Sequence, residues 1–123
     1  MTPKELEERL INFAVKTILF LDKINPTIAG RNIIGQLSRS GTSPALNYGE
    51  AQSAESGKDF VHKLRIVLKE LRETNVALKI TDRAKMHNDQ LLLDFLLIEC
   101  NELISIFVKS IETSKRTQSK INR

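Results

Sequence analysis

The sequence predicts an all-α protein, an antiparallel up-and-down four-helix bundle. Apolar residues recur with a period near 3.6 almost throughout the 123 residues, and no long segment alternates with the period of two that marks a strand. Three short interruptions containing proline, glycine or asparagine divide this pattern into four helical segments. Helices joined by short links pack as antiparallel neighbours, and a chain of this length folds around one core.

The first predicted helix begins after Thr2, which can cap it, with Pro3 in the first helical position and Glu5 completing a capping box. It is expected to stop before the Asn25-Pro26 pair, because a residue preceding proline disfavours helical geometry. Its buried face is predicted to comprise Leu6, Leu10, Phe13, Thr17, Leu21 and Ile24.

The second helix is predicted to start near Thr27 and to run to about Ala54. Pro44 lies in its middle and has no backbone N–H, so we expect the helix to be kinked near that residue or divided into two pieces. Small residues should let this helix approach a neighbour closely, namely Gly41, Ala45, Gly49 and Ala54.

The third helix is predicted to follow Ser56 as N-cap and to end at about residue 83, and the fourth to span residues 91–114. The bundle domain would then cover residues 1–114. The basic segment 115–123 is expected to be a frayed, flexible tail. The buried face of the third helix is predicted to include Phe60, Leu64, Val67, Leu71 and Leu78.

The first and fourth helices carry more apolar surface than a single bundle needs. In the fourth helix the main apolar face covers an arc of about 160°, against roughly 100° for an ordinary surface helix. Surplus apolar surface commonly marks an interface, so we predict a homo-oligomer. The surplus residues are Ile11, Val15 and Leu19 in the first helix and Leu91, Phe95, Ile98 and Ile106 in the fourth.

Basic residues follow the exposed side of the third helix. Residues 58–87 carry eight Lys or Arg against four Asp or Glu, which accounts for the net charge of +4. At 100° per residue, six of these cations share an arc of about 80°, with Asp59, Glu70 and Glu73 on the flank beyond it. We call this set the basic stripe: Lys58, Arg65, Lys69, Arg72, Lys79 and Arg83.

Two interpretations of the basic stripe remain open from the sequence. It could neutralise the phosphates of a nucleic acid, and binding would then weaken steeply with salt. It could equally be a solvated face that keeps the protein in solution, which is the usual role of Lys and Arg on helices. No aromatic residue interleaves with the stripe, so the sequence does not support base stacking.

The constellations that metals, cofactors and catalysis require are not found in the sequence. Di-iron bundles need Glu-x-x-His on two helices, whereas the nearest match is a single Asp59-Phe-Val-His62, and His87 falls in a predicted loop. The glycines of residues 41–57 fit neither a phosphate loop nor a dinucleotide fingerprint. Cys100, the only cysteine, is expected to be packed. We expect no enzyme, no metal and no cofactor.

Carboxylates lie one helical turn apart at Glu70 with Glu73 and at Glu99 with Glu102, a spacing commoner in solvated or salt-bridged pairs than in acid/base dyads. No apolar run reaches the roughly 20 residues of a membrane span. The N-terminus, MTPKELEERL, lacks the apolar core of a signal peptide. A cytoplasmic protein without a membrane role is therefore expected.

The segment from residue 36 to residue 74, QLSRSGTSPALNYGEAQSAESGKDFVHKLRIVLKELRET, closely resembles the bacterial four-helix bundle family named after intervening sequences in 23S ribosomal RNA genes. Members typically show Arg-Ser-x-x-Ser, then Ala-Asn and Glu-Ala pairs, then Ser-Lys-x-Asp-Phe and Lys-Glu-x-x-Glu-Thr. The matching residues are Arg39, Ser40, Ser43, Asn47, Glu50, Ala51, Ser56, Lys58, Asp59, Phe60, Lys63, Leu64, Lys69, Glu70, Glu73 and Thr74. The chain departs from the pattern at Leu46, where the family usually has Ala, and at Asn75-Val76, which replaces a frequent aromatic pair.

The resemblance implies an up-and-down four-helix bundle, and relatives look like homopentamers. Related pentameric bundles act as accessory proteins of retroelement reverse transcriptases and engage RNA through basic surfaces. The resemblance therefore favours an RNA or ribonucleoprotein partner. Within the motif, a polar network that fixes helix register is expected among Arg39, Asn47, Glu50, Glu70, Glu73 and Thr74, with a ligand site as the alternative.

Three functional hypotheses follow from the sequence. The first is a non-enzymatic, oligomeric RNA-binding or ribonucleoprotein accessory protein that uses the basic stripe. The second is a protein-interaction scaffold, with no nucleic-acid role, whose apolar faces receive a partner. The third, an enzyme or metal-dependent activity, has the least support in the residues.

Overall fold

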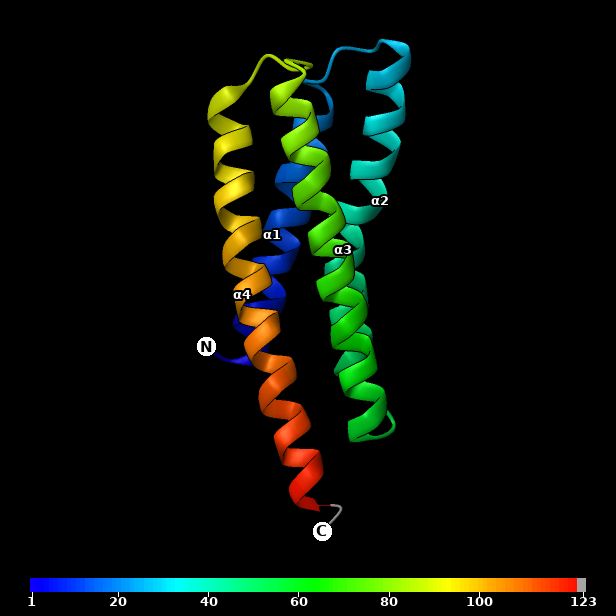
Figure 1. The fold of residues 1–123 in the computed structure, drawn as a ribbon, viewed down its shortest axis with the longest axis vertical. Coiled ribbons are helices and arrows are strands. Elements are labelled where there is room, and N and C mark those ends of the chain that lie inside the picture. The colour runs from blue at the N-terminus through cyan, green and yellow to red at the C-terminus, as the bar shows by residue number, and fades with distance from the viewer. Residues whose placement is uncertain (122–123) are drawn as a thin grey trace.

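The computed structural model describes residues 1–121, which form four α-helices. Each helix packs against its two neighbours in a ring, so that α1 contacts α2, α2 contacts α3, α3 contacts α4 and α4 contacts α1. Figure 1 shows successive helices running in opposite directions, with α3 in front of α1 and with α2 and α4 at the sides. The predicted all-α up-and-down bundle is confirmed. The helices are α1 (Pro3–Leu21), α2 (Ile28–Ala51), α3 (Gly57–Arg83) and α4 (Gln90–Ile121).

The starts of the helices are fixed by side chains that accept hydrogen bonds from otherwise unpaired backbone N–H groups. At α1 the Thr2 hydroxyl accepts from the Glu5 N–H, and the Glu5 carboxylate accepts from the Thr2 N–H, both at 3.1 Å. Ser56 caps α3 as predicted, and Thr27, near which the second helix was predicted to start, caps α2. At α4 the carboxylate of Asp89 accepts from the backbone N–H of Leu92 at 3.1 Å.

Three helix ends differ from the predictions. α1 ends at Leu21 and α2 at Ala51, each about one turn earlier than expected. α4 does not end near Ser114 but continues to Ile121, so most of the predicted tail 115–123 is helical. The rest of that tail, residues 122–123, lies outside the described residues. The extended part of α4 lies against the start of α3, where the Gln118 side chain covers the Cα of Gly57.

Pro44 lies inside α2, which continues through it as one helix instead of separating into two. The proline removes the N–H that would bond the carbonyl of Ser40, one turn earlier. The α2 ribbon changes direction near its middle (Figure 1), as expected for such a site. Close to it, Gly41 faces Thr17 of α1: a Cβ built on this glycine would lie 2.5 Å from the Thr17 methyl carbon. α2 therefore approaches α1 closely at this point.

The loops between α1 and α2 and between α3 and α4 meet at one end of the bundle (Figure 1). The Asn25 N–H donates to the Met86 carbonyl at 2.8 Å, and the Asn88 N–H donates to the Lys23 carbonyl at 3.1 Å. Ile24, predicted as the last buried residue of the first helix, is buried in this loop pair. The fully buried large side chains of the core are Phe13, Phe20, Phe107, Leu10, Leu37, Leu64, Leu71, Leu78, Leu93, Leu96, Leu103 and Val67.

Candidate nucleic-acid interface

The basic stripe lies along the outward side of α3. All six of its side chains, from Lys58 to Arg83, are exposed. Within residues 1–121, no carboxylate oxygen lies within 4.0 Å of any of these six cations. The protein's own acids in this range therefore do not neutralise the stripe by direct ion pairs.

Two acids of α3 pair with α2 and not with the stripe. Glu70 and Glu73 turn towards α2, where Arg39 contacts their carboxylates at 3.4 Å and 3.7 Å. Asp59 lies in the first turn of α3, next to its cap. The three acids predicted to flank the stripe therefore have other contacts: Glu70 and Glu73 pair with α2, and Asp59 lies at the start of α3.

An open groove of about 760 Å³ runs beside the middle of the stripe. Gln36 and Arg39 of α2 line one side of it. The remaining lining comes from α3 and mixes cations with apolar side chains: Arg65, Leu68, Lys69, Arg72, Glu73, Val76, Ala77 and Ile80. Val76 is 55% exposed and Ile80 49%, although both are apolar. This pair was not predicted from the sequence, although at 100° per residue Val76 lies within the arc of the stripe and Ile80 beside it.

A second groove, of about 580 Å³, extends the positive surface from α3 onto α4. Lys58, His62 and Arg65 line it from α3, and Lys115 and Gln118 line it from α4. Arg65 belongs to both grooves. Because α4 continues past residue 114, its last turns add Lys115 to the surface that the basic stripe begins.

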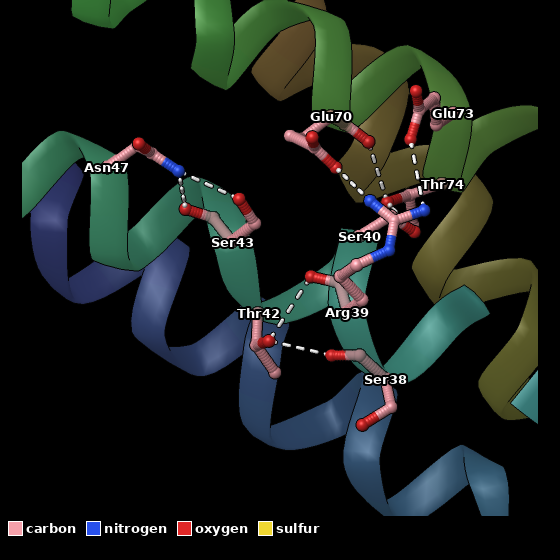
Figure 2. A network of polar contacts seen from close by, with 9 residues as sticks. All are labelled: Ser38, Arg39, Ser40, Thr42, Ser43, Asn47, Glu70, Glu73 and Thr74. Atoms are coloured by element: carbon pink, nitrogen blue, oxygen red, sulfur yellow. Dashed lines mark hydrogen bonds and ion pairs between the residues drawn. The ribbon is translucent and has the colours of Figure 1, made fainter. Parts of the chain in front are cut away.

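A polar network joins α2 to α3 next to the first groove (Figure 2). Arg39 reaches across to Glu70 and Glu73, and the hydroxyls of Ser40 and Thr74 lie 2.9 Å apart in a buried hydrogen bond. The Thr74 hydroxyl also lies 2.8 Å from the carbonyl of Glu70, one turn earlier. The predicted grouping of Arg39, Glu70, Glu73 and Thr74 is present.

Asn47 and Glu50 do not belong to this network, contrary to the prediction. Asn47 donates to the carbonyl and hydroxyl of Ser43 within α2, at 3.0 Å and 2.8 Å (Figure 2). The Glu50 side chain is 61% exposed and pairs with Lys63 at 3.1 Å. Ser40, predicted only as a motif residue, takes the buried position instead. Glu50 also contacts α3, but through Lys63 and outside the network.

A comparison with known protein families matches residues 6–109 to the family described as 23S rRNA-intervening sequence protein. The chain belongs to this family. A solved relative, a protein of unknown function from the S23 ribosomal protein family of Bacteroides thetaiotaomicron, is 25% identical and has a TM-score of 0.77. The similarity covers 91% of this chain and 99% of the relative. No curated protein matches the chain.

Seven of the sixteen motif residues through which the chain resembles the 23S rRNA-intervening sequence proteins form two groups in the structure. Arg39, Ser40, Glu70, Glu73 and Thr74 form the α2–α3 network. Lys58 and Lys69 belong to the exposed basic stripe. The family motif thus combines a helix contact with part of a positive surface.

Cys100 is packed in the core, and the Glu99–Glu102 pair is engaged by an arginine. Cys100 is fully buried and its Sγ donates to the Leu71 carbonyl at 3.2 Å, and burial raises the pKa of this thiol to about 12. Arg9 of α1 holds Glu99 of α4 through two hydrogen bonds, at 2.7 Å and 2.8 Å, and also contacts Glu102. The Glu99–Glu102 pair is therefore salt-bridged, one of the two arrangements that its spacing favoured.

Within residues 1–121, no cluster of three or more His, Cys, Asp or Glu side chains could hold a metal ion. No helix there has the length and apolar content needed to span a bilayer.

Proposed function

We propose that this chain is a non-enzymatic, self-associating protein that binds RNA through the basic stripe of α3. The observation that carries the proposal is the set of six exposed cations on one helix face, none with a carboxylate partner within 4.0 Å among the described residues. Phosphates that contact such cations release condensed counterions, which favours binding. Lys115 of α4 widens the same surface.

The comparisons support an RNA partner. The family takes its description from sequences that intervene in 23S rRNA, and the solved relative is assigned to a ribosomal protein family. The first description refers to ribosomal RNA and the second to a ribosomal protein. The net charge of +4, concentrated in residues 58–87, is consistent with attraction to a polyanion.

The test is a salt titration of binding to a structured RNA, followed by fluorescence anisotropy. Affinity should fall steeply between low and moderate salt, because each phosphate contact contributes about 0.7 to 0.9 to the slope of log K against log salt. Lys69→Gln with Arg72→Gln should weaken binding and flatten this slope. Lys4→Gln with Lys23→Gln removes two exposed cations from other parts of the surface and serves as the matched control.

Two results would contradict the RNA role. One is an affinity that stays flat as salt is raised. The other is an equal loss of affinity in the stripe variant and in the control variant, because net charge rather than the stripe would then govern binding.

Self-association is supported by the apolar side chains that the bundle leaves exposed. Leu91 is 84% exposed and Ile98 63%, on a part of α4 that also exposes Phe95. On α1 the exposed set is Ile11, Val15, Ile18 and Leu19. Ile106, predicted to belong to this surplus, is instead partly buried against the core. Apolar side chains grouped in this way mark an interface more often than scattered ones do.

The same apolar surface favours a second candidate function, a protein-interaction scaffold with no nucleic-acid role. A pull-down from the native host after nuclease treatment separates the two functions. Protein partners retained after complete digestion of nucleic acid, together with no affinity for RNA, would favour the scaffold.

A further inference from the structure

Two exposed apolar side chains interrupt the basic stripe. Val76 and Ile80 lie one turn apart and fall within or beside the arc occupied by the six cations. The core of α3 does not need them, because it is supplied by Val61, Leu64, Val67, Leu71 and Leu78 on the opposite side. A face that served only to keep the protein in solution would favour polar residues at both positions.

The groove gives these side chains a common setting. Val76 and Ile80 line it together with Leu68 and Ala77, while Arg65, Lys69 and Arg72 supply its cations. On the α2 side, Arg39 is held towards α3 by Glu70 and Glu73, and its guanidinium remains largely exposed. The apolar side chains therefore line a groove that has Arg39 on its α2 side and Arg65, Lys69 and Arg72 on its α3 side.

The dimensions indicate which ligand this surface fits. At 1.5 Å per residue, the stripe from Lys58 to Arg83 extends about 37 Å along α3. Leu68 and Ala77 also line the groove, but Ala77 is buried and Leu68 is partly buried against the core. The exposed apolar side chains, Val76 and Ile80, are separated by only about 6 Å along the helix. A docked peptide helix needs apolar anchors spread over two turns or more. A polyanion that offers one or two small apolar faces matches the proportions better, and a nucleic-acid strand with unpaired bases has that composition.

We propose that this groove binds one or two unpaired nucleobases, so that the protein prefers single-stranded or looped RNA to a duplex. This inference rests on the proposed RNA-binding function. Phosphates contact Arg65, Lys69 and Arg72, while the face of a base packs on Val76 and Ile80. In a duplex the base faces are hidden in the stack, and only an unpaired base can reach such a surface.

The chemistry of the groove also indicates how selective it is. The apolar surface is aliphatic, so the contact lacks the aromatic stacking found in many single-strand binders. The Gln36 amide and the Arg39 guanidinium at the rim can donate to the edges of a bound base. We therefore expect a clear preference for unpaired over paired RNA and little preference among base sequences.

The experiment compares three probes of equal phosphate number at one salt concentration: an unstructured RNA, a blunt RNA duplex, and a single strand of abasic ribose phosphates. Val76→Ser with Ile80→Ser should weaken binding of the unstructured RNA about three- to tenfold and leave the duplex and the abasic strand unchanged. Ile28→Ser with Leu46→Ser removes two exposed apolar side chains from α2 and should change nothing. Thermal melting confirms that both double variants remain folded.

A gain of affinity provides a second measurement. Val76→Tyr places an aromatic ring in the groove, and stacking on an unpaired base should strengthen binding of the unstructured RNA by about fivefold or more. Binding of the abasic strand should stay the same, because it has no base to stack.

Each outcome separates the inference from the proposed function. If all three probes bind equally and the groove variants change nothing, the groove inference is wrong while RNA binding stands. If none of the probes binds, the proposed function itself fails. If the Val76→Ser and Ile80→Ser variant binds RNA normally but loses a helical peptide of leucine and glutamate that the wild type binds, the groove takes a protein partner and the inference is overturned.

Discussion

At the scale of the residue, the acids of α3 decide how much positive charge its outer side presents. Glu70 could have paired with a neighbouring cation of the stripe, yet it faces Arg39 of α2 and is largely buried. Burial raises the pKa of Glu70, the nearby Glu73 carboxylate raises it further, and Arg39 and Lys69 oppose the shift. The α2–α3 contact therefore keeps the Glu70 carboxylate away from the stripe, but it places this carboxylate where water solvates its charge poorly.

The raised pKa of Glu70 gives a prediction with a definite sign. A carboxyl whose pKa is higher in the folded state stabilises the protein at low pH, and this contribution is lost as the pH rises through the folded value. Glu70→Gln, which cannot ionise, should therefore be at least as stable as the wild type at pH 7. The advantage should shrink as the pH falls towards the ordinary range of a glutamic acid.

Urea denaturation at pH 7 and pH 4.5 measures this difference. The exposed Glu50, paired with Lys63, supplies the control: Glu50→Gln should change stability little at either pH, because a surface pair contributes about 0 to 1 kcal/mol. A Glu70→Gln protein that is clearly less stable than the wild type at pH 7 would show that the Arg39 pair outweighs the burial.

At the scale of the element, the closest approach of two helices is set by a single glycine. A Cβ on Gly41 would lie 2.5 Å from the Thr17 methyl carbon and 3.1 Å from its Cβ. Thr17 is fully buried, and its hydroxyl donates to the Phe13 carbonyl at 2.8 Å, so its side chain cannot easily rotate away. At this point the backbone of α2 at Gly41 packs directly against the Thr17 side chain of α1.

Gly41→Ala should therefore destabilise the protein. Overpacking of this kind costs about 1 to 3 kcal/mol, which exceeds the gain of up to about 1 kcal/mol from replacing a helical glycine by alanine. Gly35→Ala is the matched control, because a Cβ there meets no atom within 4 Å and α2 should gain stability. Thermal melting of both variants is sufficient, and a midpoint that rises for Gly41→Ala would mean that the helices can separate without loss.

The elements also show which features a sequence can predict. Helix starts at Thr2, Thr27 and Ser56 were predicted correctly because a cap depends on residues three positions apart. The predicted end of α4 was wrong because no proline or glycine near residue 114 marks a helix end. The helix continues past this residue and lies against the start of α3 through Gln118. Contacts between helices decide such ends.

The same distinction applies to the candidate site. The cations of the basic stripe were predicted to share one exposed face, since that depends only on the period of α3. The partners of Asn47 and Glu50 depend on how α2 is rotated against α3, and the prediction for them was wrong. The groove with Val76 and Ile80 depends on both helices and was not anticipated.

At the scale of the whole molecule, the bundle separates charge from apolar surface. The basic stripe lies on α3, whereas most exposed apolar side chains lie on α1 and α4, and α1 and α3 are not adjacent helices of the ring. The Arg9–Glu99 ion pair fixes α1 against α4, and the Lys16 ammonium lies 4.6 Å from the centre of the Phe95 ring across the same junction. Copies that associate through α1 and α4 would leave the stripe of each copy open.

This arrangement predicts that association and RNA binding can be separated by mutation. Ile98→Lys places a charge in the exposed apolar surface of α4 and should dissociate the assembly towards the 14.0 kDa monomer in sedimentation velocity. Leu46→Lys, at an exposed apolar position of α2, is the control and should leave the mass of the assembly unchanged.

The dissociated protein should keep its folded melting transition and the salt slope of each RNA site, but bind more weakly overall because fewer stripes act together. A wild-type protein that sediments as a monomer at micromolar concentration would refute the association, and the salt slope of its RNA binding would then report a single stripe.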